Sequence, residues 1–145
     1  MNNLQIEQVN YSEAKLAIKA IRVKVFQEEQ KVSEELEFDG LDEISIQLLA
    51  YLDSKPVGTA RIRDVGEQTA KIERLAVLSE ARGNGIGKKL METALEILVN
   101  SNYHTVIIHA QEYIKQMYQQ LGFKQIGDTF EEANIPHVKM IKRIS

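Results

Sequence analysis

The sequence predicts a mixed α/β domain. Apolar runs suited to strands alternate along the chain with segments whose apolar residues have helical spacing. Residues 72–98 have the pattern of a buried strand, a glycine-rich turn and an amphipathic helix, which begins a right-handed crossover between parallel strands. The three strands ahead of that helix are separated only by short turns, which indicates a meander. The predicted order is strand, helix, three strands, helix, strand, helix and two strands.

Composition places the chain among ordinary globular proteins. Its 145 residues, 43% hydrophobic and 27% charged, suit one domain spanning residues 1–145. The net charge of -3 gives no general attraction to nucleic acid. The absence of cysteine excludes disulfides, thiolate metal sites and a cysteine nucleophile. Neither a signal peptide nor a run of membrane-spanning length is visible, so we expect a cytoplasmic protein without a membrane partner.

The first predicted elements are an edge strand and a capped helix. Apolar and polar residues alternate loosely over residues 4–9, as in an edge strand. Asn10 can cap the helix that follows, and Glu13 can complete a capping box. Apolar residues at helical spacing extend this helix to about Gln27.

An acidic segment follows at residues 28–43, and it is predicted as helix and loop. Two interpretations of its eight carboxylates are open. They could line a solvated face of the protein. Alternatively, some of them could attract a cationic acceptor to a cleft.

The remaining chain supplies most of the sheet. The predicted strands cover residues 44–52, 57–65, 70–77, 105–110, 123–130 and 137–144. The predicted helices cover residues 86–98 and 114–121, and Gly122 is a natural left-handed cap for the second. Residues 131–136 are the expected loop between the last two strands.

The glycine turn, residues 83–87, has the pattern of an anion site. Its glycines permit close backbone approach, and the helix that follows begins with cationic Lys88 and Lys89. A P-loop does not fit, because Arg82 stands where a glycine is required and Lys89 where Ser or Thr is required. A dinucleotide fingerprint does not fit either, because Lys88 replaces its third glycine.

A third phosphate pattern, Arg/Gln-x-x-Gly-x-Gly/Ala, is satisfied by Arg82, Gly85 and Gly87. The strand before it ends in Leu-Ala-Val at residues 75–77. With these motifs the chain resembles the GNAT superfamily of acetyl-coenzyme-A-dependent N-acetyltransferases. The resemblance implies a GNAT fold: an α/β (α+β) domain with a mixed six- to seven-stranded sheet and about four helices.

The second half of the chain extends this resemblance. Tyr118, Gly122 and Phe123 match the Tyr-x-x-x-Gly-Phe signature of the family. Gln111 stands seven residues before the tyrosine, where the family usually has asparagine.

A narrower resemblance links the chain to the small bacterial ElaA/YjcF-like subgroup. The segments that carry it are RVKVFQEEQKV at residues 22–32, HAQ at 109–111 and IPHVKM at 135–140. That subgroup often has a histidine where this chain has Gln47. If that histidine serves the acceptor, its role is absent or altered here.

The resemblance implies acetyl-coenzyme A as acetyl donor. Its pyrophosphate would bind the backbone N–H groups of the turn, with Arg82 and Lys88 adding charge. Its pantetheine arm would pair with the strand that ends at Val77, whose N–H would polarise the thioester carbonyl. The implied cofactor-binding residues are Leu75, Ala76, Val77, Arg82, Gly83, Asn84, Gly85, Ile86, Gly87, Lys88, Gln111 and Tyr118.

Two residues are candidates for proton transfer. Glu73 is the candidate base, since period-two spacing puts it on one strand face with Leu75 and Val77. It could instead pair with a nearby arginine: Arg61, Arg63 or Arg74. Tyr118 is the candidate acid for the departing thiolate, and the alternative is an aromatic side chain packed in the core.

Phe26, Gln30 and His137 are candidates for the acceptor pocket, and His137 could also be an alternative base or simply structural. The three histidines have no metal-ligand spacing, so we expect no metal. The implied reaction is direct acetyl transfer to a primary amine of a small molecule or peptide, by a bacterial monomer or homodimer. The acidic segment favours a cationic acceptor. The alternative is a coenzyme-A-binding sensor or structural module without turnover.

Overall fold

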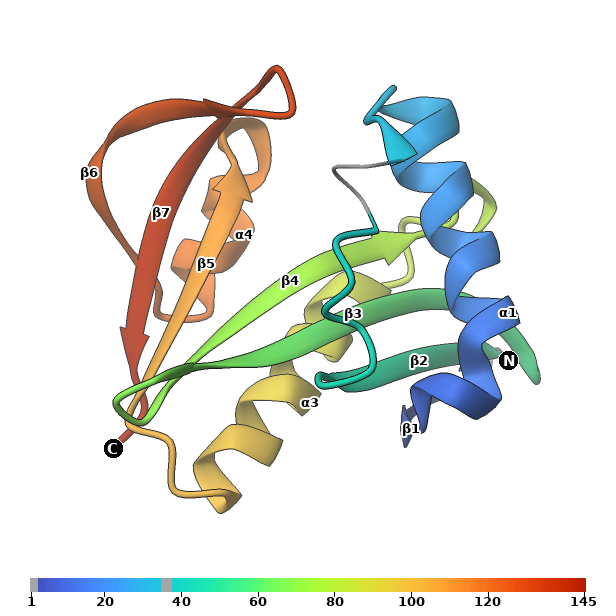
Figure 1. Ribbon diagram of the computed structural model, residues 1–145, viewed down its shortest axis with the longest axis horizontal. Helices are drawn as coiled ribbons and strands as arrows, with labels where there is room; N and C mark the ends of the chain where they lie inside the picture. Colours follow the sequence, from blue (N-terminus) through green and yellow to red (C-terminus); the bar gives the residue numbers. More distant parts are fainter. Residues whose placement is uncertain (1–2, 35–37) are drawn as a thin grey trace.

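The computed structural model of this chain describes residues 3–34 and 38–145, and its centre is one seven-stranded sheet (Figure 1). The strands are β1 (Leu4–Val9), β2 (Ile46–Leu52), β3 (Lys55–Gly66), β4 (Thr69–Val77), β5 (Thr105–Gln111), β6 (Lys124–Glu132) and β7 (Ile135–Arg143). The helices are α1 (Tyr11–Arg22), the π-helix η1 (Val23–Glu29), the 3₁₀ turns η2 (Ser79–Ala81) and η3 (Glu112–Ile114), α3 (Ile86–Asn100) and α4 (Lys115–Gln120).

The spatial order of the strands is β1-β2-β3-β4-β5-β7-β6. Strands β1 to β4 are antiparallel neighbours, and β5, β7 and β6 are also antiparallel. The two halves of the sheet meet where β4 and β5 pair in parallel, connected by α3. This pairing extends only from Thr69 and Thr105 to Lys71 and Ile107, and beyond it the two strands diverge (Figure 1).

Helices α1 and α3 cover opposite faces of the β1–β4 half (Figure 1). The α1 helix buries Ile18 and Ile21, and α3 buries Leu90, Ala94 and Leu98. These positions are three or four residues apart, so each helix directs one apolar stripe at the sheet. Neither these helices nor any other in the part of the chain that the structure describes is long and apolar enough to cross a membrane.

The predicted mixed α/β sheet and its element order are confirmed, as is the Asn10 cap. The Asn10 Oδ1 accepts a hydrogen bond from the Ser12 N–H at 3.0 Å. We expected about four helices, whereas the described residues contain three α-helices. The first ends at Arg22 and continues as a π-helix, in which each N–H reaches one residue further back than in an α-helix.

The expected loop at residues 131–136 was wrong. Pairing of β6 with β7 continues to Glu132 and Ile135, which leaves only Ala133 and Asn134 as the turn. Both turn residues have positive φ, 52° and 63°, as the two-residue turns that match strand twist require.

Gly58 on β3 allows α3 to approach the sheet closely. An added Cβ would lie 3.1 Å from Ile86 Cγ2 and 3.2 Å from Leu90 Cδ1. We therefore predict that Gly58→Ala lowers the free energy of unfolding by about 1–3 kcal/mol, because α3 must shift outward. Urea unfolding of the variant and the wild type measures this difference.

The matched control is Gly87→Ala in the first turn of α3, where the nearest atom to an added Cβ is Val77 Cγ2 at 3.9 Å. Its stability should equal or exceed that of the wild type, since alanine is the better helix former. Equal stability of both variants would contradict the close approach at Gly58.

Candidate active site

A β-bulge at Arg74 sets the direction of the side chains on β4. Glu73 pairs with Arg61 and Ala76 with Thr59, so β4 has one residue more than β3 between these pairs. Arg74 absorbs it with a φ of 56°. Directly paired residues share a face of a sheet, so Glu73 lies on the face of Ala76 and opposite to Val77. The prediction that Glu73 shares a face with Val77 was wrong because of this bulge.

The end of β4 presents free backbone toward the side from which β5 has diverged. Leu78 N–H donates to Val57 O at 2.8 Å, so the backbone groups of the preceding Val77 point away from β3. The Val77 carbonyl accepts a hydrogen bond from Arg82 Nε at 3.0 Å. The Val77 N–H therefore faces the opening between β4 and β5.

The glycine turn brings a row of unpaired donors beside this strand end. Gly83 and Gly85 have φ values of 86° and 71°, which a side chain would disfavour. Within the described residues, the six N–H groups from Gly83 to Lys88 have no acceptor, and that of Lys89 is the first to bond, to Gly85 O at 3.0 Å. The N-terminal end of α3 is thus a surface suited to an anion.

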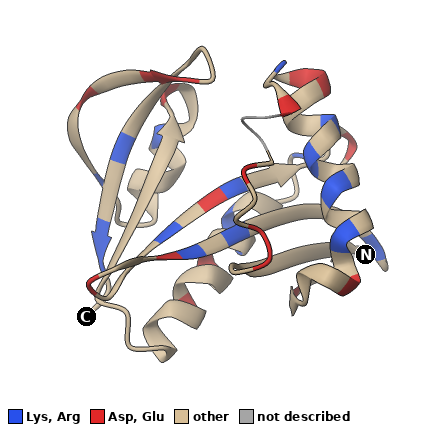
Figure 2. Ribbon diagram, in the orientation of Figure 1, with Lys and Arg blue, Asp and Glu red and all other residues tan. Residues whose placement is uncertain are grey.

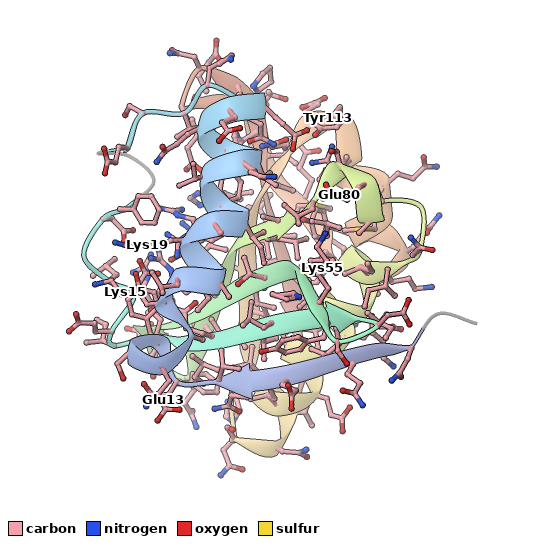
Figure 3. The ribbon with its side chains drawn as sticks, turned by 90° about the vertical axis from the view of Figure 1, so that its right-hand side faces the viewer. Glu13, Lys15, Lys19, Lys55, Glu80 and Tyr113 are labelled. Atoms are coloured by element: carbon pink, nitrogen blue, oxygen red, sulfur yellow. The ribbon has the colours of Figure 1, made fainter. Side chains whose placement is uncertain are left out.

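The η2 turn precedes these donors and is tied to the sheet. Glu80 in η2 lies 3.9 Å from Lys55 at the start of β3, and the two are neighbours in Figure 3. Within the loop that follows, Asn84 Nδ2 donates to Ala81 O at 2.8 Å. The turn is therefore held in place from both sides of Arg82.

Arg82 is fully engaged within the protein. Its Nε holds the Val77 carbonyl, and its two terminal nitrogens donate to the carboxylate of Glu29 at 2.9 and 2.8 Å. This hydrogen bond raises the pKa of Arg82 further above its ordinary value. Arg82 thus connects η1 to the end of β4, whereas Lys88 is exposed at the turn.

Glu73 lies in a cluster of cations on the α1 side of the sheet. Its carboxylate contacts Arg61, accepts a hydrogen bond from Arg63 Nε at 3.0 Å and lies 3.3 Å from Lys71 Nζ. Burial alone would raise the pKa of Glu73, but the bonds to Arg63 and Arg61 and the charge of Lys71 lower it to about 2. The geometry favours the ion-pair alternative for Glu73, because so acidic a carboxyl group is a weak base.

The acidic segment is joined to the same cluster: its acidic residues cross β3 and β4, and those two strands carry charges of both signs (Figure 2). Asp39 accepts two hydrogen bonds from Arg61, at 2.8 and 2.9 Å. Buried Asp42 pairs with Arg22 at 2.6 Å and accepts from Gln47 Nε2 at 3.2 Å. The charges of Asp39 and Asp42 are thus balanced by arginines, whereas Glu28, Glu34 and Glu43 are exposed, in keeping with the solvated-face interpretation.

Arg74 pairs with Asp39 at 3.1 Å, whereas Glu73 pairs with Arg61, Arg63 and Lys71. The acidic residues Glu35 and Glu37 lie outside the described residues. Of the remaining carboxylates in the segment, Glu29 is bound to Arg82. The acidic composition therefore says little about the charge of an acceptor.

Tyr118 projects from α4 and is only 6% exposed. Its ring packs edge-to-face on Phe123, with centroids 6.2 Å apart. Burial raises the pKa of Tyr118, so the phenol keeps its proton at neutral pH. None of the described residues forms a hydrogen bond with its hydroxyl group.

The predicted acceptor residues are not all together. Gln30, just after η1, accepts a hydrogen bond from Gln111 Nε2 at 2.9 Å and so connects the end of η1 to β5. Phe26 is buried in the core instead of lining an open surface. His137 is 6% exposed, holds Ile135 O through Nδ1 at 2.7 Å and stacks on Phe130.

Sequence reasoning missed two residues beside His137. Glu132 Oε1 lies 3.0 Å from His109 Nδ1, and its Oε2 lies 3.7 Å from His137 Nε2. The period-two spacing of His109 and Gln111 puts both on one face of β5 and could have indicated His109. No group of three metal-ligating side chains occurs within residues 3–34 and 38–145.

Comparison with known proteins agrees with this geometry. The sequence model of the Acetyltransferase (GNAT) domain matches residues 8–144. The uncharacterized protein YyaT of Bacillus subtilis is 41% identical over 128 residues, which cover 86% of each chain. The uncharacterized N-acetyltransferase YjcF of the same organism is 32% identical over 84% of this chain and 87% of its own. The crystal structure of Escherichia coli ElaA superposes with a TM-score of 0.85 and 25% identity, over 97% and 99% of the two chains.

These matches define the class of protein. The chain belongs to the GNAT acetyltransferase family and is an acyltransferase by that membership. The predicted resemblance to ElaA and YjcF is confirmed, since both are among its relatives.

The ion pairs of Glu73 predict a loss of stability in acid. The folded pKa of about 2 lies below the ordinary value of 4.5, so these pairs stabilise the protein above pH 4.5. That stabilisation should disappear progressively as the pH falls from 4.5 toward 2. Urea unfolding at pH 7, 4 and 3 measures it, and Glu73→Gln should show a weaker dependence on pH.

Glu96→Gln on the exposed face of α3 is the control and should keep the wild-type dependence. An unchanged pH dependence in Glu73→Gln would show that this carboxylate does not stabilise the fold through its charge.

Proposed function

We propose that the protein is an acetyl-coenzyme-A-dependent N-acetyltransferase that moves acetyl directly to a primary amine of a small molecule or peptide. The observation that carries this proposal is the row of six unpaired N–H groups from Gly83 to Lys88 beside the free N–H of Val77. One feature suits a pyrophosphate and the other suits an extended arm with amide groups. Acetyltransfer is the activity for which the family is named.

The donor-binding role is divided between loop and strand. In this proposal the six free backbone N–H groups that follow Arg82 hold the pyrophosphate. They belong to Gly83, Asn84, Gly85, Ile86, Gly87 and Lys88. Leu75, Ala76 and Val77 pair with the pantetheine arm as a missing strand would, and Gln111 borders it from β5. The Val77 N–H would donate a hydrogen bond to the thioester carbonyl oxygen, on which negative charge develops during the reaction.

Arg82 then acts mainly by holding the Val77 carbonyl and the loop in position. With its three nitrogens occupied by Val77 O and Glu29, it fixes the carbonyl next to the reactive N–H and closes the loop onto η1. Lys88 supplies the mobile cation at the phosphates.

Tyr118 is the proposed general acid. The acceptor nitrogen forms a bond to the acetyl carbon, the carbon–sulfur bond breaks, and the sulfur receives the phenolic proton of Tyr118. Its hydroxyl group, protonated at neutral pH and unused by the described residues, suits this role. The chain contains no cysteine to carry an acyl intermediate, in keeping with direct transfer.

The alternative is a sensor or structural module that binds coenzyme A without turnover. It is favoured by the low pKa of Glu73, because a carboxylate held by Arg61, Arg63 and Lys71 is a weak base for the amine. Either protein would be a bacterial, cytoplasmic GNAT domain, monomeric or homodimeric. Release of free thiol in the presence of a panel of amines separates the two.

We predict that wild type releases thiol from acetyl-coenzyme A in proportion to an amine of the panel. Tyr118→Phe should lower kcat about a hundredfold, at the low end for a general acid because a thiolate is a good leaving group. Binding of acetyl-coenzyme A, measured by calorimetry, should change little. Steady-state thiol release measures kcat.

Tyr51→Phe on β2 is the matched control and should keep the wild-type rate. Tight binding of acetyl-coenzyme A without thiol release in the presence of any amine would contradict the proposal of an enzyme and support that of a sensor. A wild-type rate in Tyr118→Phe would contradict only the assignment of Tyr118 as the general acid.

A further inference from the structure

Four side chains gather on one face of the β5-β7-β6 half of the sheet. His109 comes from β5, His137 from β7, and Phe130 and Glu132 from β6. The Phe130 ring meets His109 edge-on at 5.2 Å and stacks on His137 at 6.0 Å. The carboxylate of Glu132 lies between the two imidazoles. This His–Glu cluster has no role in the donor site described above.

The hydrogen-bond partners determine which imidazole nitrogens carry protons. The bond to His109 and the charges of His109 and His137 hold the pKa of Glu132 below its ordinary value, so it is a carboxylate. A carboxylate can only accept, so His109 must donate through Nδ1. Neutral His109 therefore has its lone pair on Nε2. His137 donates through Nδ1 to the Ile135 carbonyl, which fixes the same tautomer.

The register of the sheet places His109 at the opening between the strands. Lys71 and Ile107 form the last pair between β4 and β5. Side chains alternate along a strand, so His109 is the first residue beyond that pair on the face of Ile107. Glu73 follows Lys71 by two residues on β4, so it is level with His109 across the opening. The next residue of this β5 face is Gln111, paired with His137.

His109 is also more accessible than Glu73, the residue level with it on β4. Its side chain is 26% exposed, whereas that of Glu73 is 7% exposed and saturated with cations. An imidazole with a fixed tautomer, held by a carboxylate on one nitrogen and open on the other, is the arrangement of a general base.

We propose that His109 is the proton acceptor for the amine, that Glu132 orients it, and that His137 and Phe130 complete the acceptor subsite. This inference rests on the proposed function. The acceptor ammonium gives one proton to Nε2 of His109, and the freed lone pair forms the carbon–nitrogen bond. As the amide forms, the nitrogen loses its second proton to solvent, and the Tyr118 phenolate regains from solvent the proton that it gave to sulfur.

Titratable and charged groups of several elements lie on the strands and turn next to His109. They are Lys71 and Glu73 on β4, Glu112 in η3, Glu132 on β6, and His137 and Lys139 on β7. Lys139 is the direct cross-strand partner of His109. Among them, Glu132 is the carboxylate that bonds directly to the ring.

The test is the pH profile of kcat/KM for the amine in wild type and variants. His109→Gln should lower kcat/KM about a hundredfold at neutral pH and remove its acid-side inflection. Glu132→Gln keeps an oxygen that accepts from Nδ1 but loses the charge, so it should retain the inflection and shift it to lower pH. His104→Gln, an exposed histidine just before β5, is the matched control and should keep the wild-type profile.

The outcomes separate the two proposals. A wild type without turnover on any amine overturns the proposed function and this inference with it. A wild type that turns over, with a His109→Gln variant that keeps its rate and inflection, overturns only the inference. Thermal melts show whether His109→Gln is folded. If it is not, an unmoved inflection in Glu132→Gln overturns the inference alone.

Discussion

The divergence of β4 from β5 after Lys71 is the constraint on which the rest of this structure depends. A strand in the middle of a sheet normally has both edges hydrogen-bonded, and unpaired backbone is costly where water is excluded. Here the end of β4 has β3 on one side and no strand on the other. The free edge at Val77 suits a ligand with amide groups of its own, such as the coenzyme A thioester that we propose as donor.

The neighbouring elements keep this edge open. Gly58 lets α3 lie close to the sheet, so the unpaired N–H groups at its start adjoin the strand end. The bulge at Arg74 turns Glu73 to the α1 face and Val77 to the α3 face. Buried Arg61 forms ion pairs with Asp39, Asp42 and Glu73. These pairs connect the bulge to the loop before β2. Removing one member would leave a buried charge without its partner.

Local signals predicted the elements and the donor loop. Glycine spacing, Arg82 and the apolar stripe of α3 are features of adjacent residues, so the sequence alone indicates an anion site followed by a helix. The two-residue turn at Ala133 and Asn134 was missed because EEANIP contains the residues of a longer loop. Its strands form through pairing across the hairpin, which overrides local preference.

The chemistry of single side chains was harder to predict, because it depends on partners far along the chain. Glu29, fifty-three residues before Arg82, occupies that guanidinium group. Glu73 was placed on the wrong face because period-two reasoning assumes an unbroken strand, and one bulge inverts it. The contact of His109 with Glu132 spans β5 and β6, which have β7 between them.

The most direct test of the central claim is NMR-detected hydrogen exchange of the Val77 amide. The account predicts rapid exchange in the free protein and strong protection when acetyl-coenzyme A is added. The Leu78 amide, bonded to Val57 O, should be slow in both states. A Val77 amide that is already protected in the free protein, or that stays unprotected at saturating ligand, would contradict the open strand edge as the donor site.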